Sequence, residues 1–376
     1  MIVSAAQVVT PARVLAPGWL LLEGARIVEV GEGPPPRSPD VALGDVTVAP
    51  GFVDIHVHGG GGASFDAGTP DAAEVVAAAH LAHGTTSMAA SLVTDTTDRM
   101  AAAVRELAGL VAAGHLAGIH LEGPWLSPRR SGAHQPGALA HPDPAAVEAL
   151  LAAGDGAVRM VTLAPELPGG LDAVRRLDAA GVVVAIGHTD ATYDQARAAL
   201  DAGARVGTHL FNAMRALHHR EPGAAGALLD STAAVELIAD GVHLHPAVLR
   251  AAFAAAPGRC ILVTDAMAAA GAPDGDYRLG PMDIEVRDGI ARLADSTGDG
   301  AIAGSTLTMD AAVRFAVRTA DLPLVDVVRA ASTVPAAAWG LDDVGALAPG
   351  RRADLVVLDA GLGVVRVMRS GAWVRR

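Results

Sequence analysis

A short apolar run that ends in a polar or small residue recurs along this chain, and each run is followed by an alanine-rich stretch. The runs span residues 52–58, 85–93, 118–123, 158–165, 182–188, 204–211, 234–241 and 260–267. Amphipathic helices are predicted over 71–83, 96–113, 144–153, 171–180, 191–202 and 246–256. This alternation is typical of βα units and a parallel sheet. Eight runs predict an α/β fold, a (β/α)8 TIM-type barrel, with a doubly wound open sheet as the alternative.

The two ends of the chain follow a different pattern. "EGARIVEVG" (23–31) resembles a hairpin, and "ADLVVLDAG" (353–361) and "VVRVMRSG" (364–371) read as short strands. We expect residues 1–50 and 341–376 to form one small β-sandwich domain. Residues 51–340 would form the barrel domain, with a β-hairpin insertion near 275–297 and final helices over 306–319 and 322–339.

Composition excludes several classes of function. The apolar runs of this 376-residue chain are interrupted well before the roughly 18 residues that cross a bilayer, so no membrane segment is expected. The net charge of −13 argues against nucleic acid as a partner. One cysteine and the lack of a basic segment before an apolar one favour a cytoplasmic protein without a signal peptide. All 28 basic residues are arginine, which excludes a Schiff-base or carboxylated lysine.

The stretch "GFVDIHVHGG" (51–60) places two histidines at the end of a predicted buried strand. Successive side chains of a strand alternate between its faces, so His56 and His58 share one face with Asp54. In a barrel this face points inward, and its end lines the opening where barrel enzymes work. Three ionisable groups there are costly to bury, and a bound cation offsets that cost.

Metal-ligand residue types also end other predicted strands. Glu122 ends the third run, His188 the fifth, His209 the sixth and Asp265 the eighth. Nitrogen and oxygen ligands of this kind suit a divalent ion, zinc first, with iron, manganese or cobalt as alternatives. This set predicts metal-assisted hydrolysis, in which a metal-activated water is the nucleophile. Asp265 is the candidate general base and acid; its alternative is a helix N-cap.

Several motifs together resemble a known family. They are "PGFVDIHVHG", "GIHLEGPWLSPRRSGAH", "IGHTDATYDQ", "GTHLFNAM", "REPG", "IADGVHLHP", "LVTDAM" and "GSTLTMD". The first is similar to the amidohydrolase superfamily, and the whole set resembles its N-acetylglucosamine-6-phosphate deacetylases over nearly the entire chain. The resemblance implies that this chain removes the acetyl group of N-acetylglucosamine 6-phosphate, a small phosphorylated amino sugar, to give glucosamine 6-phosphate and acetate.

The resemblance also implies roles at the metal site. The ligands found throughout the family match Glu122, His188 and His209, and the extra ligands of members with a second metal match His56 and His58. One or two ions per subunit are therefore expected. Asp265 matches the acid/base, and His134, in "SGAH", matches the histidine that holds and polarises the acetamide.

Substrate contacts are implied in the same way. Asn212 and Ala213 match the segment that meets the sugar phosphate, and Leu307 matches a residue lining the acetyl pocket. Arg220, in "REPG", and His243, in "DGVH", match phosphate and sugar contacts that reach in from a neighbouring subunit. The resemblance therefore implies a homodimer.

Other readings stay open. A second amidohydrolase activity, such as another deacetylase, a cyclic-amide hydrolase or a deaminase, uses a similar set of ligands. A non-catalytic sensor of amino-sugar phosphates would have lost a ligand or Asp265, and neither is lost. No role is assigned to His218 and His219, and the arginines Arg129 and Arg130 are attributed to codon bias. Three further histidines are expected on helix surfaces, namely His80, His83 and His115.

Overall fold

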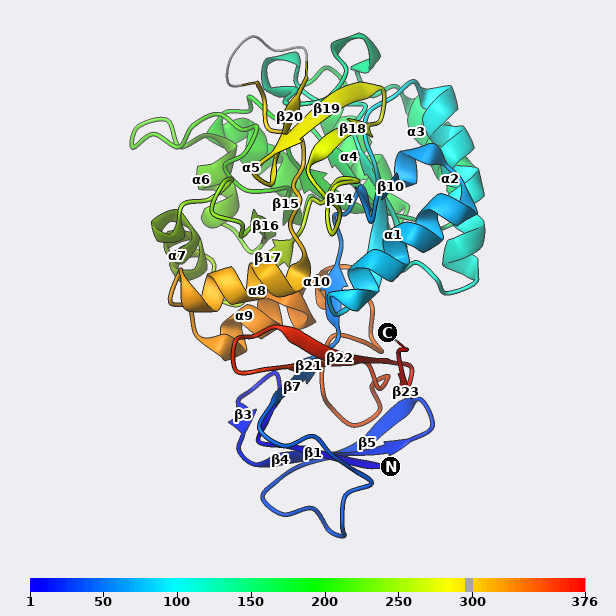
Figure 1. Ribbon diagram of the computed structural model, residues 1–376. Coiled ribbons are helices and arrows are strands. Elements are labelled where there is room, and N and C mark those ends of the chain that lie inside the picture. Colours follow the sequence, from blue (N-terminus) through cyan, green and yellow to red (C-terminus); the bar gives the residue numbers. More distant parts are fainter. Residues whose placement is uncertain (295–299, 376) are drawn as a thin grey trace.

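The predicted barrel is present (Figure 1). The computed structural model describes residues 1–294 and 300–375, and within these residues eight parallel strands form one sheet. In order of pairing, the strands are β17 (Cys260–Val263), β16 (Ala234–Ile238), β15 (Val206–Gly207), β14 (Val183–Ile186), β13 (Val158–Leu163), β12 (Gly118–Glu122), β11 (Thr85–Leu92) and β8 (Phe52–Asp54). Val57 forms a parallel bridge to Ala266, which joins the last strand to the first. This closure excludes the open-sheet alternative and confirms the (β/α)8 fold.

Helices surround the barrel (Figure 1). They are α1 (Pro70–Ala82), α2 (Thr97–Ala112), α3 (Pro144–Gly154), α4 (Gly170–Ala179), α5 (Tyr193–Asp201), α6 (Gly223–Leu229), α7 (Pro246–Ala255), α8 (Met309–Arg318), α9 (Leu324–Ala331) and α10 (Thr333–Ala338). The short α6 has no polar periodicity and was not predicted. The helix predicted over 322–339 is two helices, because the ring of Pro335 is incompatible with a continuous helix at the carbonyl four residues earlier.

The chain ends form a β-sandwich below the barrel in Figure 1. One sheet has the order β5 (Arg26–Glu32), β4 (Gly18–Glu23), β1 (Ile2–Ala5) and β6 (Val41–Ala42). The other has the order β23 (Ala372–Trp373), β22 (Val364–Arg369), β21 (Leu355–Leu358), β7 (Thr47–Pro50), β2 (Gln7–Val9) and β3 (Val14–Leu15). Leu20 and Leu22 of the first sheet and Val48 and Leu355 of the second share one buried core. The sandwich of the predicted fold is therefore confirmed; the domain boundaries at residues 50 and 341 stay a prediction.

Two smaller sheets lie near the barrel opening. The first pairs β9 (Gly59–Gly60) with β10 (Ala63–Ser64). The second has three antiparallel strands, β18 (Gly275–Leu279), β19 (Met282–Arg287) and β20 (Ile290–Leu293), where two were predicted. Residues 295–297 of the predicted insertion lie outside the described residues. Short 3-10 helices η1 (Phe65–Ala67), η2 (Pro128–Arg130) and η3 (Pro136–Ala138) lie in the loops after β8 and β12.

No helix within residues 1–294 and 300–375 is long and apolar enough to cross a membrane.

His80 lies inside the protein, so its predicted surface position is wrong. Only 1% of this residue is exposed, because helix α1 packs over β9 and directs the ring toward Gly59. Its Nε2 donates to the Gly59 carbonyl oxygen at 2.9 Å. Burial lowers the pKa of His80 to about 4. The ring is therefore neutral in the folded protein at neutral pH.

We expect His80 to make folding stability depend on pH. An unfolded imidazole titrates near 6.5, so between pH 6.5 and 4 the unfolded chain binds a proton that folded His80 does not. The free energy of unfolding should fall across this range, by about 3 kcal/mol from this group alone. His80→Gln, whose amide still donates to Gly59, should show a shallower fall in urea titrations between pH 7.5 and 4.5. The exposed His141→Gln is the control, and equal slopes in all three proteins would contradict the assignment.

Candidate active site

The predicted polar residues meet at one opening of the barrel. Glu122 is the last residue of β12. The residues that stand two positions beyond the last residue of their strand are His56, His188, His209 and Asp265. Because the strands are parallel and adjacent, equivalent positions lie at the same end of the barrel.

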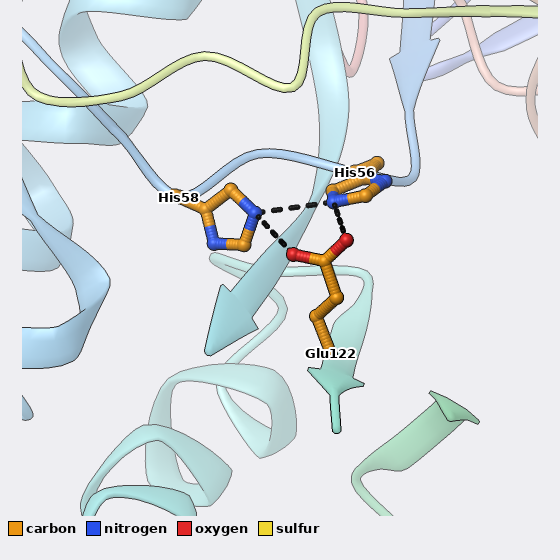
Figure 2. Close-up of side chains that lie close together, drawn as sticks. All are labelled: His56, His58 and Glu122. Atoms are coloured by element: carbon orange, nitrogen blue, oxygen red, sulfur yellow. Dashed lines mark hydrogen bonds and ion pairs between the residues drawn. The ribbon is translucent and has the colours of Figure 1, made fainter. Parts of the chain in front are cut away.

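The histidine pair lies just beyond the end of its strand. Strand β8 ends at Asp54 rather than at His58, and the Val57 amide donates to Oγ of Ser91 at 2.9 Å. The rings of His56 and His58 point toward each other, with their Nε2 atoms 3.1 Å apart and both close to the Glu122 carboxylate (Figure 2). The two side chains thus lie together, as expected from their spacing, and their role as metal ligands stays a prediction.

Three of these residues have a left-handed backbone. The φ angle is 45° at His188, 27° at His209 and 48° at Asp265. This region is uncommon for residues other than glycine and is enriched at functional sites. The sharp turn after each strand directs the side chain across the opening.

The carboxylate of Glu122 is the centre of the cluster. Its Oε1 lies 3.1 Å from Nε2 of His188, 3.1 Å from Nε2 of His209 and 3.6 Å from Nε2 of His56. Its Oε2 lies 3.2 Å from Nε2 of His58 and 3.3 Å from Nε2 of His134. Glu122 is 3% exposed, so five imidazoles share one carboxylate away from water.

These distances fit bound divalent cations. Ligand atoms about 2.0–2.1 Å from a tetrahedral zinc ion lie about 3.3–3.4 Å from one another, which is the spacing around Glu122. Two groups of ligand atoms meet the spacing for one ion each, and they share Glu122. One is His56, His58 and Glu122, and the other is Glu122, His134 and His188. His209 adjoins the second group, with its Nε2 3.1 Å from that of His188.

Hydrogen bonds on the far side of two rings prepare them as ligands. Nδ1 of His188 donates to the Arg130 carbonyl oxygen at 2.8 Å, and Nδ1 of His56 donates to Oε2 of Glu236 at 3.0 Å. Since both acceptors need a proton on Nδ1, Nε2 is the nitrogen of each ring that can offer a lone pair to a bound cation.

The charge of the cluster also favours a cation. Burial lowers the pKa of His58, but its hydrogen bonds to Asp265 and Glu122 outweigh burial and raise this pKa to about 9. The pKa of His56 is likewise raised, because the carboxylates of Asp265, Glu122 and Glu236 outweigh its burial. Positive charge at this point is therefore strongly favoured.

Asp265 faces the same two histidines. Its Oδ1 lies 3.4 Å from Nε2 of His56 and 3.3 Å from Nε2 of His58. Burial raises the pKa of Asp265, but the charge of His56 and the hydrogen bond from His58 outweigh burial and hold this pKa well below its usual range. Asp265 is not an N-cap, since no helix in the described residues begins beside it and its carboxylate points into the cluster.

His134 has the opposite tautomer. The Thr94 amide donates to its Nδ1 at 3.3 Å, so the ring proton is on Nε2, which faces Oε2 of Glu122. Burial and the charge of His188 lower the pKa of His134 to about 4. The ring is thus a neutral hydrogen-bond donor, which suits polarisation of a carbonyl better than metal binding.

A pocket of about 360 Å³ opens over the cluster. Among the residues predicted to bind substrate, those on its wall are His134, Asn212, Ala213 and His243. His243 donates from Nδ1 to Oδ2 of Asp240 at 2.6 Å. It was expected to reach a neighbouring active site, but it lines the pocket of its own barrel.

Arg220 and Leu307 do not line this pocket. Arg220 lies in an exposed loop together with Leu217, which is 49% exposed. Leu307 is buried, with its amide donating to Oγ of Ser305 at 3.0 Å. Their predicted roles stay predictions.

Sequence reasoning missed two contributions to the site. Glu236 lies within β16 in the barrel interior, and the signal was an acidic residue inside an apolar run. Arg129 and Arg130 were attributed to codon bias, yet both line the pocket. Their guanidinium groups bind Asp190, at 3.2 Å for Arg129 and 2.9 Å for Arg130.

Comparison with known proteins identifies the family. A model of the amidohydrolase family matches residues 47–374. The chain belongs to the amidohydrolase family. The resemblance of its motifs to one branch of this family is confirmed by named relatives. An N-acetylgalactosamine-6-phosphate deacetylase of Escherichia coli O157:H7 is 40% identical over 330 residues, 86% of this chain and 86% of the relative. An N-acetylglucosamine-6-phosphate deacetylase of Vibrio furnissii is 36% identical over 340 residues, 89% and 84% of the two chains.

Solved structures of amidohydrolases are also similar to the structure of this chain. An aspartate-to-alanine variant of the N-acetyl-D-glucosamine-6-phosphate deacetylase of Mycobacterium smegmatis, in complex with N-acetyl-D-glucosamine-6-phosphate, is 52% identical with a TM-score of 0.97. The match covers 100% of this chain and 99% of that one. The N-acetylglucosamine-6-phosphate deacetylase of Thermotoga maritima is 31% identical with a TM-score of 0.90, and the match covers 100% of both chains.

We expect the substitution Glu122→Gln to weaken metal binding at the cluster of this amidohydrolase. The amide keeps the shape but removes the one charge that five imidazoles share, and removing one partner of a buried ion pair costs about 3–5 kcal/mol. We expect metal affinity to fall at least about 100-fold in chelator competition. Glu166→Gln is the matched control, because Glu166 accepts from Thr189 Oγ1 and the Asp190 amide beside the site but touches no imidazole. Unchanged metal content in Glu122→Gln would contradict the central place of this carboxylate.

Proposed function

We propose that this chain is a metal-dependent deacetylase that converts N-acetylglucosamine 6-phosphate and water into glucosamine 6-phosphate and acetate. The observation that carries the proposal is the Glu122-centred cluster, open to a pocket, in a chain whose named relatives are amino-sugar phosphate deacetylases. We propose His56, His58, Glu122, His188 and His209 as ligands of one or two divalent ions, with zinc first and iron, manganese or cobalt as alternatives.

A divalent cation bound there would polarise the acetamide carbonyl and make the attacking water more acidic. Asp265, whose carboxylate faces the cluster, accepts the proton of the water as the new C–O bond forms. The same residue then returns this proton to the sugar nitrogen as the C–N bond breaks. His134 donates from Nε2 to the carbonyl oxygen while negative charge builds up on it.

Positive groups are needed for the phosphate, because the chain has a net charge of −13. Arg129 and Arg130 provide them on the pocket wall, and Asn212 and Ala213 lie nearby. We propose that Arg220 reaches the phosphate from the neighbouring subunit of a homodimer. Its place on an exposed loop beside the exposed Leu217 supports this arrangement.

We also propose a cytoplasmic location, which the single cysteine supports.

A second substrate is favoured by one observation. The Escherichia coli O157:H7 relative, which is 40% identical, is an N-acetylgalactosamine-6-phosphate deacetylase. This sugar differs only in the configuration at one hydroxyl group, so the same cluster and phosphate groups can serve it. Leu307 is proposed to lie near the acetyl group in either case.

The substrate proposal is tested by product analysis. With N-acetylglucosamine 6-phosphate we expect acetate and glucosamine 6-phosphate in equal amounts and no ammonia, and a lower kcat/KM with N-acetylgalactosamine 6-phosphate. Removing the phosphate should lower kcat/KM about 100-fold or more, since charge-assisted hydrogen bonds contribute roughly 1.5–3 kcal/mol each. Ammonia release would point to a deaminase instead. Binding without any product from the metal-loaded protein would point to a sensor.

Asp265→Asn should separate binding from chemistry. The amide fills the same space but cannot take a proton from water, and general acid–base catalysis contributes about 10²–10⁴-fold. We expect kcat to fall by about 10³-fold, with bound metal and the Kd for N-acetylglucosamine 6-phosphate close to wild type. Turnover within a few-fold of wild type would remove Asp265 from the mechanism.

A further inference from the structure

Glu236 is a buried acidic residue for which the proposed reaction has no direct use. It lies in the middle of β16, in the run "AVELI", and its exposure is 0%. A buried carboxylate is costly unless it is hydrogen-bonded, so its partners indicate why it is there.

The metal cluster has two halves that share Glu122. One half is His56, His58 and Glu122, and the other is Glu122, His134 and His188, which His209 adjoins. Glu236 has a partner on each side. Its Oε2 accepts from Nδ1 of His56 at 3.0 Å and from the His209 backbone amide at 3.3 Å. Its Oε1 has no hydrogen-bond partner among the described residues. One side-chain oxygen thus links the His56 ring to the backbone at His209.

The contact affects the two halves differently. At His56 it acts on the ring, because a proton on Nδ1 leaves the Nε2 lone pair free for a cation and a carboxylate partner raises the basicity of that nitrogen. At His209 it acts only on the backbone. In the other half, Nδ1 of His188 is already occupied by the Arg130 carbonyl oxygen, so that ring does not depend on Glu236.

The other buried polar groups nearby have different partners. Asp54 accepts from Oγ1 of Thr264 at 2.6 Å, and its contact with His56 is a long one of 3.4 Å to the backbone amide. The His120 ring packs edge-on against His56, but its nitrogens pair with Ser91 and Thr162. Neither group touches a ring nitrogen of the cluster.

We infer that Glu236 is a positioning residue that gives the half formed by His56, His58 and Glu122 its affinity for a second divalent cation. The inference rests on the proposed metal-dependent function and adds which residue determines occupancy of its second site. Partners of this kind typically change metal affinity by about 10–100-fold.

The test measures zinc affinity, not only activity. Purified full-length wild type and Glu236→Gln are stripped of metal and titrated with Zn²⁺ in competition with a chromophoric chelator, and bound zinc is counted by elemental analysis. We expect two equivalents in wild type. In Glu236→Gln we expect the Kd of the weaker equivalent to rise about 10–100-fold and that of the tighter one to change less than about threefold.

Controls separate this role from loss of folding. Asp54→Asn is the matched variant, since it also replaces a buried carboxylate in the barrel interior, and we expect it to leave both zinc affinities near wild type because Asp54 contacts no ring nitrogen of the cluster. Glu236→Asp, which keeps the charge but shortens the reach, should restore part of the lost affinity. Thermal unfolding and circular dichroism of each apo protein show whether it is folded.

Three outcomes would overturn the inference. They are two unchanged zinc affinities in folded Glu236→Gln, an equal loss at both equivalents, and a wild type that holds only one equivalent. None of them decides the proposed function, which is judged separately by acetate release from N-acetylglucosamine 6-phosphate.

Discussion

Closure of the barrel between its first and last strands is the constraint on which the site depends. The Asp265 amide donates to the His56 carbonyl oxygen at 2.9 Å, and the His58 amide donates to that of Ala266 at 2.8 Å. These backbone bonds bring residues more than 200 positions apart into contact and leave both imidazoles facing the aspartate. The parallel strands between them then supply Glu122, His188 and His209 to the same opening. A sheet left open between β8 and β17 would leave His56 and His58 apart from Asp265.

Concentrating these groups is possible because their charges and hydrogen bonds compensate one another. Five imidazoles and two carboxylates are buried together, and each would be costly in isolation. Each imidazole nitrogen that is directed at Glu122 has a carboxylate oxygen as its neighbour. Glu236 in the barrel interior accepts from Nδ1 of His56, and the Arg130 carbonyl oxygen in the loop after β12 accepts from Nδ1 of His188. These hydrogen bonds therefore orient both rings before any ligand arrives.

Much of the fold and of the candidate site could be predicted from the order of residues in the sequence. The eight apolar runs specified the strands, and the polar residue ending five of them specified the cluster, because parallel strands align their ends. Spacing could not reveal contacts made inside the barrel or through loops. Glu236 was hidden in an apolar run, His80 was placed on a helix surface because packing of α1 on β9 is a tertiary event, and Pro335 divided a predicted helix. The pocket positions of Arg129 and Arg130 depend on Asp190, a partner 60 residues away.

At His188, His209 and Asp265 the left-handed backbone favours glycine, whereas the proposed chemistry requires the side chains that are present. Glycine would adopt these angles without strain, so the residue that best suits the local backbone is one that can neither bind a cation nor carry a proton. Glycine substitutions made to relax these turns would remove the side chains to which metal binding and proton transfer are assigned in our proposal, so efforts to stabilise this enzyme should leave the turns untouched.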